Sequence, residues 1–288
     1  MNENCAIITP SFRGDFVRCQ LLVESIQRFV PDHVKHYLVV DRRDMSIFHP
    51  LQSNRTRLLV VEELLPWWIM RLPRLRRFWW SFRSLPIRNW ILQQIVKLSV
   101  PHVVPEEYLF YVDSDVFFVR PFDPSDLIRN GQAPLFCETG KSSFGSFNDE
   151  WHAVAARIIG IPVETNYDTI FVGNIVCWRK SLVKRLSERI EAVSNRHWVL
   201  SVVRHLKFSE YVLYGMFVTR LAIDEPPLHY RDSGNGALCL CYWGNSPLGD
   251  DALADFKAQL AETNVAVMIS AKSKTDVGQI RRVFGSPA

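Results

Sequence analysis

The segment from Tyr108 to Phe122, YLFYVDSDVFFVRPF, sets two carboxylates inside a run of apolar residues typical of a buried strand. Asp113 and Asp115 flank Ser114 in the middle of this run. Burying a carboxylate costs several kcal/mol unless a partner compensates it, so the strand is predicted to end where the acids begin. We therefore expect both acids at an edge of a sheet, where a ligand can reach them.

The first half of the chain alternates between strand patterns and helix patterns. Strands are predicted at 5–9, 36–40, 57–63 and 108–112. Helices are predicted at 16–30, where apolar residues recur every three or four positions, and at 87–98. Strands that alternate with helices at this spacing predict an α/β fold with a mostly parallel sheet flanked by helices.

The second half of the chain has a looser pattern. Strands are predicted at 134–138, 171–178 and 265–269, with Cys239 and Cys241 on one face of another strand, and helices at 149–159, 180–193, 198–206 and 209–221. The tail after Lys272 is polar, and we expect it to be mobile. The predicted organisation is one domain over residues 1–245, divided at residue 125, and a C-terminal appendage over residues 246–288.

Polar loops follow three of the predicted strands. They are Thr9 to Ser11, Asp41 to Arg43 and Asp113 to Asp115. Parallel sheets of this class bind ligands at the carboxyl ends of their strands, so these loops are expected to line one crevice.

The Asp-Ser-Asp sequence suits a hard divalent cation. Mg²⁺ and Mn²⁺ accept carboxylate oxygens and keep coordination positions open for phosphate oxygens. A nucleoside diphosphate is therefore the expected additional ligand of the metal. The simpler alternative is a surface turn after a strand, where Asp and Ser are common.

Composition limits the classes of function. The chain has 288 residues, 48% of them hydrophobic, and a net charge of +4, which is too small and too local to favour nucleic-acid binding. Its start lacks a signal-peptide pattern and no long apolar run is present, so we expect a cytoplasmic location. The six cysteines show no zinc-type spacing and are expected to be reduced.

Residues 65–90 are rich in tryptophan and arginine. No acid occurs between Glu63 and Glu106. Tryptophan favours the headgroup layer of a membrane and arginine favours anionic phosphates, so this segment is a candidate for peripheral contact with the inner face of a membrane or with a lipid-linked acceptor. Aromatic residues that bind sugar would give the same pattern. A further alternative is that the tryptophans pack in the core while the arginines reach solvent.

The segment around Asp113 and Asp115 resembles the D-x-D segment of GT-A glycosyltransferases, including glycogenin, the bacterial galactosyltransferases of lipooligosaccharide synthesis and an uncharacterised bacterial family. The resemblance continues in order along residues 5–232, through NWILQQIVKLSV (89–100), FVGNIVCWRKSLV (171–183) and FSEYVLYGMFV (208–218). It implies a GT-A fold, a hexosyl transfer from a nucleotide sugar, with a UDP-sugar favoured, and a bacterial surface glycan or lipid-linked acceptor. Residues 1–125 would bind the nucleotide and 126–245 the acceptor.

The resemblance also implies roles for single residues. Asp113 and Asp115 would hold Mn²⁺ or Mg²⁺, with His229 or Asp232 as the third ligand. Glu210 is the acid nearest the acceptor and, with Asp115, would be catalytic. The residues implied in donor binding are Thr9, Pro10, Ser11, Asp41, Arg43, Lys97, Asp113, Ser114 and Asn174. Considered alone, Lys97 is more typical of a solvated helix residue and His229 of a hydrogen-bonded core histidine.

Two other functions are compatible with the sequence. VDSDV also satisfies the nucleophile motif of haloacid-dehalogenase-type phosphatases, with Asp113 as nucleophile, and GDDALAD (249–255) imitates their late acidic motif. The motif comes late in the chain for that family. The other alternative is a non-catalytic protein that binds a membrane surface through residues 65–90.

Overall fold

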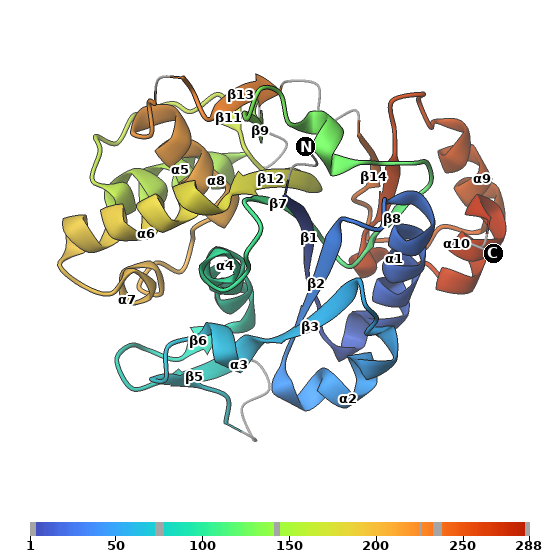
Figure 1. The fold of residues 1–288 in the computed structure, drawn as a ribbon, viewed down its shortest axis with the longest axis horizontal. Helices are drawn as coiled ribbons and strands as arrows, with labels where there is room; N and C mark the ends of the chain where they lie inside the picture. The colour runs from blue at the N-terminus through green and yellow to red at the C-terminus, as the bar shows by residue number, and fades with distance from the viewer. Residues whose placement is uncertain (1–3, 73–77, 141–144, 225, 233–237, 286–288) are drawn as a thin grey trace.

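The central sheet of the computed structural model confirms the α/β fold with a mostly parallel sheet (Figure 1). The structure describes residues 4–72, 78–140, 145–224, 226–232 and 238–285. The strand order is β12-β7-β1-β2-β3, and only β12 runs antiparallel to its neighbour. The strands are β1 (Cys5–Pro10), β2 (Lys35–Val40), β3 (Thr56–Val60), β7 (Tyr108–Val112) and β12 (Ile175–Arg179).

Helices cover both faces of this sheet. The longer helices are α1 (Phe16–Phe29), α4 (Asn89–Ser99), α5 (Ser146–Ile159), α6 (Lys180–Ser194), α8 (Glu210–Arg220), α9 (Asp250–Ala258) and α10 (Val277–Phe284). The short ones are α2 (Met45–Phe48), α3 (Val61–Leu64) and α7 (Trp198–Val202). Figure 1 shows α4, α6 and α8 on one side of the sheet and α1 on the other. None of the helices in the described part of the chain is long and apolar enough to cross a membrane.

Strand alternation explains why the sheet is apolar on both faces. Ala6 and Ile8 of β1 pack in the cluster that contains the side chains of α4, α5, α6 and α8. Cys5 and Ile7, their neighbours in sequence, face a second cluster that includes Leu22 of α1. Successive side chains of a strand point to opposite faces, so a strand covered on both sides must be apolar throughout.

The C-terminal residues pack against the strand that follows the Asp-Ser-Asp loop. A small sheet has the order β14-β15-β8, formed by β8 (Val116–Phe118), β14 (Cys239–Tyr242) and β15 (Ala266–Ile269). The expectation of a mobile tail after Lys272 is wrong, because Ile280 of α10 is 1% exposed in a cluster with Leu253. This segment forms a helix with apolar residues on one side only, and its many polar residues led to the wrong expectation.

Smaller sheets complete the molecule. β4 (Ile69–Met70), β5 (Phe78–Ser81) and β6 (Ile87–Arg88) form an antiparallel sheet within the tryptophan-rich segment. Two two-stranded sheets are formed by β9 (Ala133–Phe136) with β13 (His229–Asp232), and by β10 (Glu138–Thr139) with β11 (Thr169–Ile170). Several predicted boundaries move. The strand expected at 57–63 ends at Val60 and is followed by α3, the strand expected from 171 begins at Ile175, and the helix expected over 198–206 ends at Val202.

Candidate functional site

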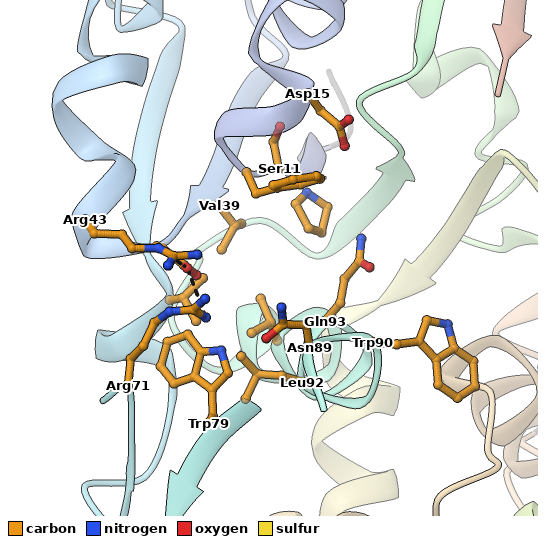
Figure 2. A pocket seen from close by; sticks show the side chains of 15 residues that line it. Ser11, Asp15, Val39, Arg43, Arg71, Trp79, Asn89, Trp90, Leu92 and Gln93 are labelled. Carbon is orange, nitrogen blue, oxygen red and sulfur yellow. Dashed lines mark ion pairs between the residues drawn. The ribbon is translucent and has the colours of Figure 1, made fainter. Parts of the chain in front are cut away.

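A pocket of about 350 Å³ opens where β1 and β2 end, against the first turns of α4 (Figure 2). Its lining comes from the ends of β1 and β2 with the loops that follow them, the first residue of α3, the tryptophan-rich segment and α4. The lining residues are Pro10, Ser11, Phe12, Asp15, Val39, Asp41, Arg43, Val61, Arg71, Trp79, Asn89, Trp90, Leu92, Gln93 and Val96. The pocket therefore lies at the carboxyl ends of parallel strands, where sheets of this class bind ligands.

Four residues predicted to bind a nucleotide line this pocket: Pro10, Ser11, Asp41 and Arg43. Thr9 does not. Its side chain is fully buried and its hydroxyl is 3.1 Å from Nε2 of His36 inside the sheet. Successive side chains of β1 point to opposite faces, so the side chain of Thr9 packs against β2 while those of the residues after it reach the pocket.

Two arginines hold the carboxylate of Asp41. Its Oδ2 lies 3.1 Å from Nε of Arg43 and 3.3 Å from Nη1 of Arg71, and the guanidinium of Arg71 lies 5.0 Å from the ring centre of Trp79. Burial raises the pKa of Asp41, and Arg71 and Arg43 act against that shift. Sequence reasoning missed Arg71 and Trp79 as pocket residues. The sequence feature that could have identified them is the absence of acids from this segment, because its arginines can pair only with carboxylates elsewhere in the chain.

A buried lysine connects the Asp-Ser-Asp loop to α8. Nζ of Lys97 lies 3.2 Å from Oδ1 of Asp113, 3.2 Å from Oε1 of Glu210 and 2.8 Å from the hydroxyl of Tyr211. The side chain of Lys97 is only 4% exposed. Burial acts against its charge, but Asp113, Tyr211 and Glu210 outweigh burial and raise the pKa of Lys97 well above its usual value. Lys97 is thus a charged member of the site and not a solvated helix residue.

Glu210 begins α8 and faces this lysine. Its backbone N–H donates to Oε1 of Gln94 in α4 at 3.1 Å, and Ser209 caps the helix. Burial raises the pKa of Glu210, and the charge of Lys97 opposes the shift. A buried carboxylate is stable in a fold when a cation compensates it, and here Lys97 of α4 is that cation.

Ser114 and Asp115 point to other neighbours. The hydroxyl of Ser114 donates to Oδ2 of Asp15 at 3.3 Å, and Oδ2 of Asp115 accepts from the backbone N–H of Ala271 at 2.9 Å. Burial, together with the negative charge of Asp113, raises the pKa of Asp115 to about 6. Since Asp15 also lines the pocket, the Ser114 hydrogen bond joins the Asp-Ser-Asp loop to the pocket wall.

Asn174 lies at the same edge of the sheet. It precedes Ile175, which pairs with Val112 at the end of β7. Its Nδ2 donates to Sγ of Cys241 at 2.8 Å, so the amide is turned toward β14.

The third-ligand prediction for His229 is wrong. Nδ1 of His229 is 3.0 Å from the carbonyl oxygen of Ala133 and Nε2 is 2.7 Å from the hydroxyl of Tyr214. With both ring nitrogens occupied and a pKa lowered by burial to about 4, His229 is a neutral hydrogen-bonded histidine. Asp232 lies on the same strand, β13, which pairs with β9 and not with β7. In the described ranges, no three His, Cys, Asp or Glu residues are grouped as a metal site.

The sequence itself matches a family profile over residues 4–240, which is most of the chain. The chain belongs to the DUF6492 family. That family is described as one of unknown function. No curated protein matches the chain.

Among solved structures, this DUF6492 chain is similar to one titled as the apo structure of WbbM, a bifunctional glycosyltransferase. The TM-score is 0.53 and the sequence identity is 11%. The match covers 99% of this chain but only 50% of the WbbM chain, so this chain spans about half the length of that protein. At this identity the likeness establishes a shared fold.

The two carboxylates of the Asp-Ser-Asp loop in the DUF6492 chain fit a divalent cation that takes its other ligands from a bound molecule. Asp113 and Asp115 offer two carboxylates, and burial together with the negative charge of Asp113 raises the pKa of Asp115. Mg²⁺ is usually held by one or two carboxylates together with water and substrate phosphates, so a third protein ligand is not required.

Proposed function

We propose that this chain is a metal-dependent glycosyltransferase of the GT-A type, which transfers a sugar from a nucleoside-diphosphate donor, with a UDP-sugar favoured, to a bacterial surface glycan or a lipid-linked acceptor. One observation carries the proposal. A pocket of nucleoside size at the strand ends adjoins, through Asp15 and Ser114, a loop with two carboxylates and a buried lysine. The fold likeness to WbbM supports it.

The pocket wall would bind the nucleoside. Asp41 would accept hydrogen bonds from the base or the ribose, and Arg43 and Arg71 fix the orientation of its carboxylate. Phe12, which lines the pocket and is 51% exposed, would supply apolar surface for the flat base. This combination of apolar walls with one oriented carboxylate is typical of a site that selects one base.

Asp113 and Asp115 would hold Mn²⁺ or Mg²⁺, and the metal would neutralise charge on the departing nucleoside diphosphate. The ammonium of Lys97 lies beside Asp113 and adds a fixed positive charge at the same place. This geometry supports stabilisation of the leaving group as the main catalytic effect.

Glu210 is best suited to a positioning role. Its carboxylate is ion-paired to Lys97 at 3.2 Å and its side chain is 6% exposed, so its position fixes the lysine against Asp113. A base that deprotonates an acceptor must reach that acceptor within hydrogen-bond distance. In the described conformation, the Glu210 carboxylate is ion-paired with Lys97 and does not act as such a base.

The test is release of nucleoside diphosphate from a panel of nucleotide sugars in the presence of Mn²⁺. We expect one donor to be turned over, and Asp113→Asn to reduce its turnover on the order of 100-fold or more, as loss of charge stabilisation does. Asp224→Asn, which breaks the surface pair with Arg185, should leave turnover unchanged. Equal turnover in both variants would remove Asp113 from the mechanism.

The phosphatase alternative loses its second motif in this fold. GDDALAD begins α9, on the outer edge of the molecule in Figure 1. Asp250 lies 3.5 Å from Arg282 of α10 and is 56% exposed. An acid at that place supports the packing of two surface helices, so this motif does not favour phosphatase chemistry over sugar transfer.

A further inference from the structure

A second pocket lies on the other side of α4 from the candidate nucleotide pocket. It has a volume of about 310 Å³ and is bounded by the β5–β6 connection, α4 and the residues after α7. Ile91 lines this second pocket, whereas Gln93 lines the first. Residues two apart on a helix project about 200° from each other, so the two pockets occupy opposite faces of the same turn.

Three arginines line the second pocket: Arg83, Arg88 and Arg204. In the described part of the chain, none of the three forms an ion pair with a carboxylate. The sequence explains this, because no acid occurs at 64–105 or at 192–209, and these two segments meet here. Three like charges that share one pocket repel each other, and a bound anion would relieve that repulsion.

Apart from the three arginines and Ser84, the lining of this pocket is apolar. Ile87 and Ile91 are buried in its wall, and the exposed rim carries Leu85 (84% exposed) and Leu206 (59%). Phe82, next to Arg83 in the chain, is 61% exposed. Large apolar side chains grouped on a surface mark a contact with another protein or with a membrane.

The adjoining strand shows the same arrangement. In β5, Trp79 is buried in the core while Phe78 and Trp80, on the opposite face, are more than a third exposed. Trp67 is 74% exposed and lies 5.7 Å from the guanidinium of Arg83. Tryptophan beside arginine on an exposed surface is the combination that favours the headgroup layer of a bilayer.

We propose that this pocket binds the phosphate of an anionic lipid headgroup, with the rim leucines and the nearby aromatic side chains inserted among the acyl chains. A free phosphate would use the arginines, but it would not account for the exposed apolar rim. The inference does not depend on the chemistry at Asp113, so either can fail without the other.

The test is co-sedimentation of the full chain with phosphatidylcholine vesicles, with and without phosphatidylglycerol. We expect binding only to the anionic vesicles. The triple variant Arg83→Gln, Arg88→Gln, Arg204→Gln should weaken that binding about fivefold per arginine, and so on the order of 100-fold in total. A matched triple variant with equal charge loss elsewhere, Arg57→Gln, Arg185→Gln, Arg282→Gln, should bind as the wild type does.

Two further arms separate the lipid from a soluble anion. The variant Leu85→Ser, Leu206→Ser keeps all three arginines, and we expect it to lose on the order of tenfold or more in vesicle binding. Inorganic phosphate should not displace the protein from anionic vesicles. Equal binding to neutral vesicles, equal loss in the two arginine variants, or binding of inorganic phosphate without binding to vesicles would each overturn the proposal.

Discussion

Lys97 sets the charge balance of the candidate site. It is the cation shared by Asp113, which is 39% exposed, and Glu210, which is buried. Burial penalises the charges of Lys97 and Glu210, and the fold tolerates them because opposite charges lie 3.2 Å apart. The same ammonium would face the diphosphate of a donor, so stability and function depend on one side chain.

Replacing Lys97 by Met should therefore lower both stability and activity. We expect a loss of about 3 to 5 kcal/mol in the free energy of unfolding, because Glu210 is left as a buried charge without its partner. Adding Glu210→Gln to the Lys97→Met variant should recover part of that loss but none of the activity. The measurement is urea unfolding of both variants, with Lys207→Met, which removes an exposed ion pair, as the control. Equal stability of the wild type and the Lys97→Met variant would show that the pair is not coupled.

Among the elements, the three parallel strands β1, β2 and β3 are joined by a buried polar contact. His36 of β2 lies between Thr9 of β1 and Thr56 of β3, with nitrogen–oxygen distances of 3.1 and 3.3 Å. Burial lowers the pKa of His36 to about 3. The native chain therefore keeps His36 neutral where an unfolded chain would bind a proton, since an unperturbed histidine has a pKa near 6.5.

This contact predicts a pH dependence of stability. Above pH 6.5 the histidine is neutral in both states and contributes no pH dependence. As pH falls from 6.5 toward 3, only the unfolded chain gains the proton, so stability is lost, by about 3 kcal/mol at pH 4. Urea unfolding at pH 7 and pH 4 should show that His36→Gln loses about 3 kcal/mol less than the wild type over this range. An identical loss in the two proteins would contradict this account of His36.

The same elements show how much the sequence could predict. The buried strands and long amphipathic helices were correct because the pattern of apolar residues reports local packing directly. The sequence did not predict the burial of Thr9, the hydrogen bonds of His229 or the helix at 277–284, because each depends on partners far away in the chain. Arg71 is the clearest case: it reaches Asp41 across 30 positions, and no local pattern encodes that ion pair.

At the scale of the whole molecule, α4 separates the two pockets. One of its faces borders the candidate nucleotide pocket and another borders the arginine pocket, while Lys97 near its end meets Asp113. A lipid headgroup in the arginine pocket and a donor in the nucleotide pocket would contact different faces of the same helix. This arrangement connects the two proposals spatially while leaving each with its own test.

Calorimetric titration of UDP, GDP and CMP, with Mn²⁺ and with EDTA, tests the central claim most directly. We predict that one nucleoside diphosphate binds with Mn²⁺, and that its affinity falls at least tenfold with EDTA or in Asp115→Asn, which keeps the side-chain size but weakens metal ligation. Asp224→Asn should bind as the wild type does. Failure of every nucleotide to bind, or binding unchanged by both EDTA and Asp115→Asn, would contradict a metal-dependent transferase.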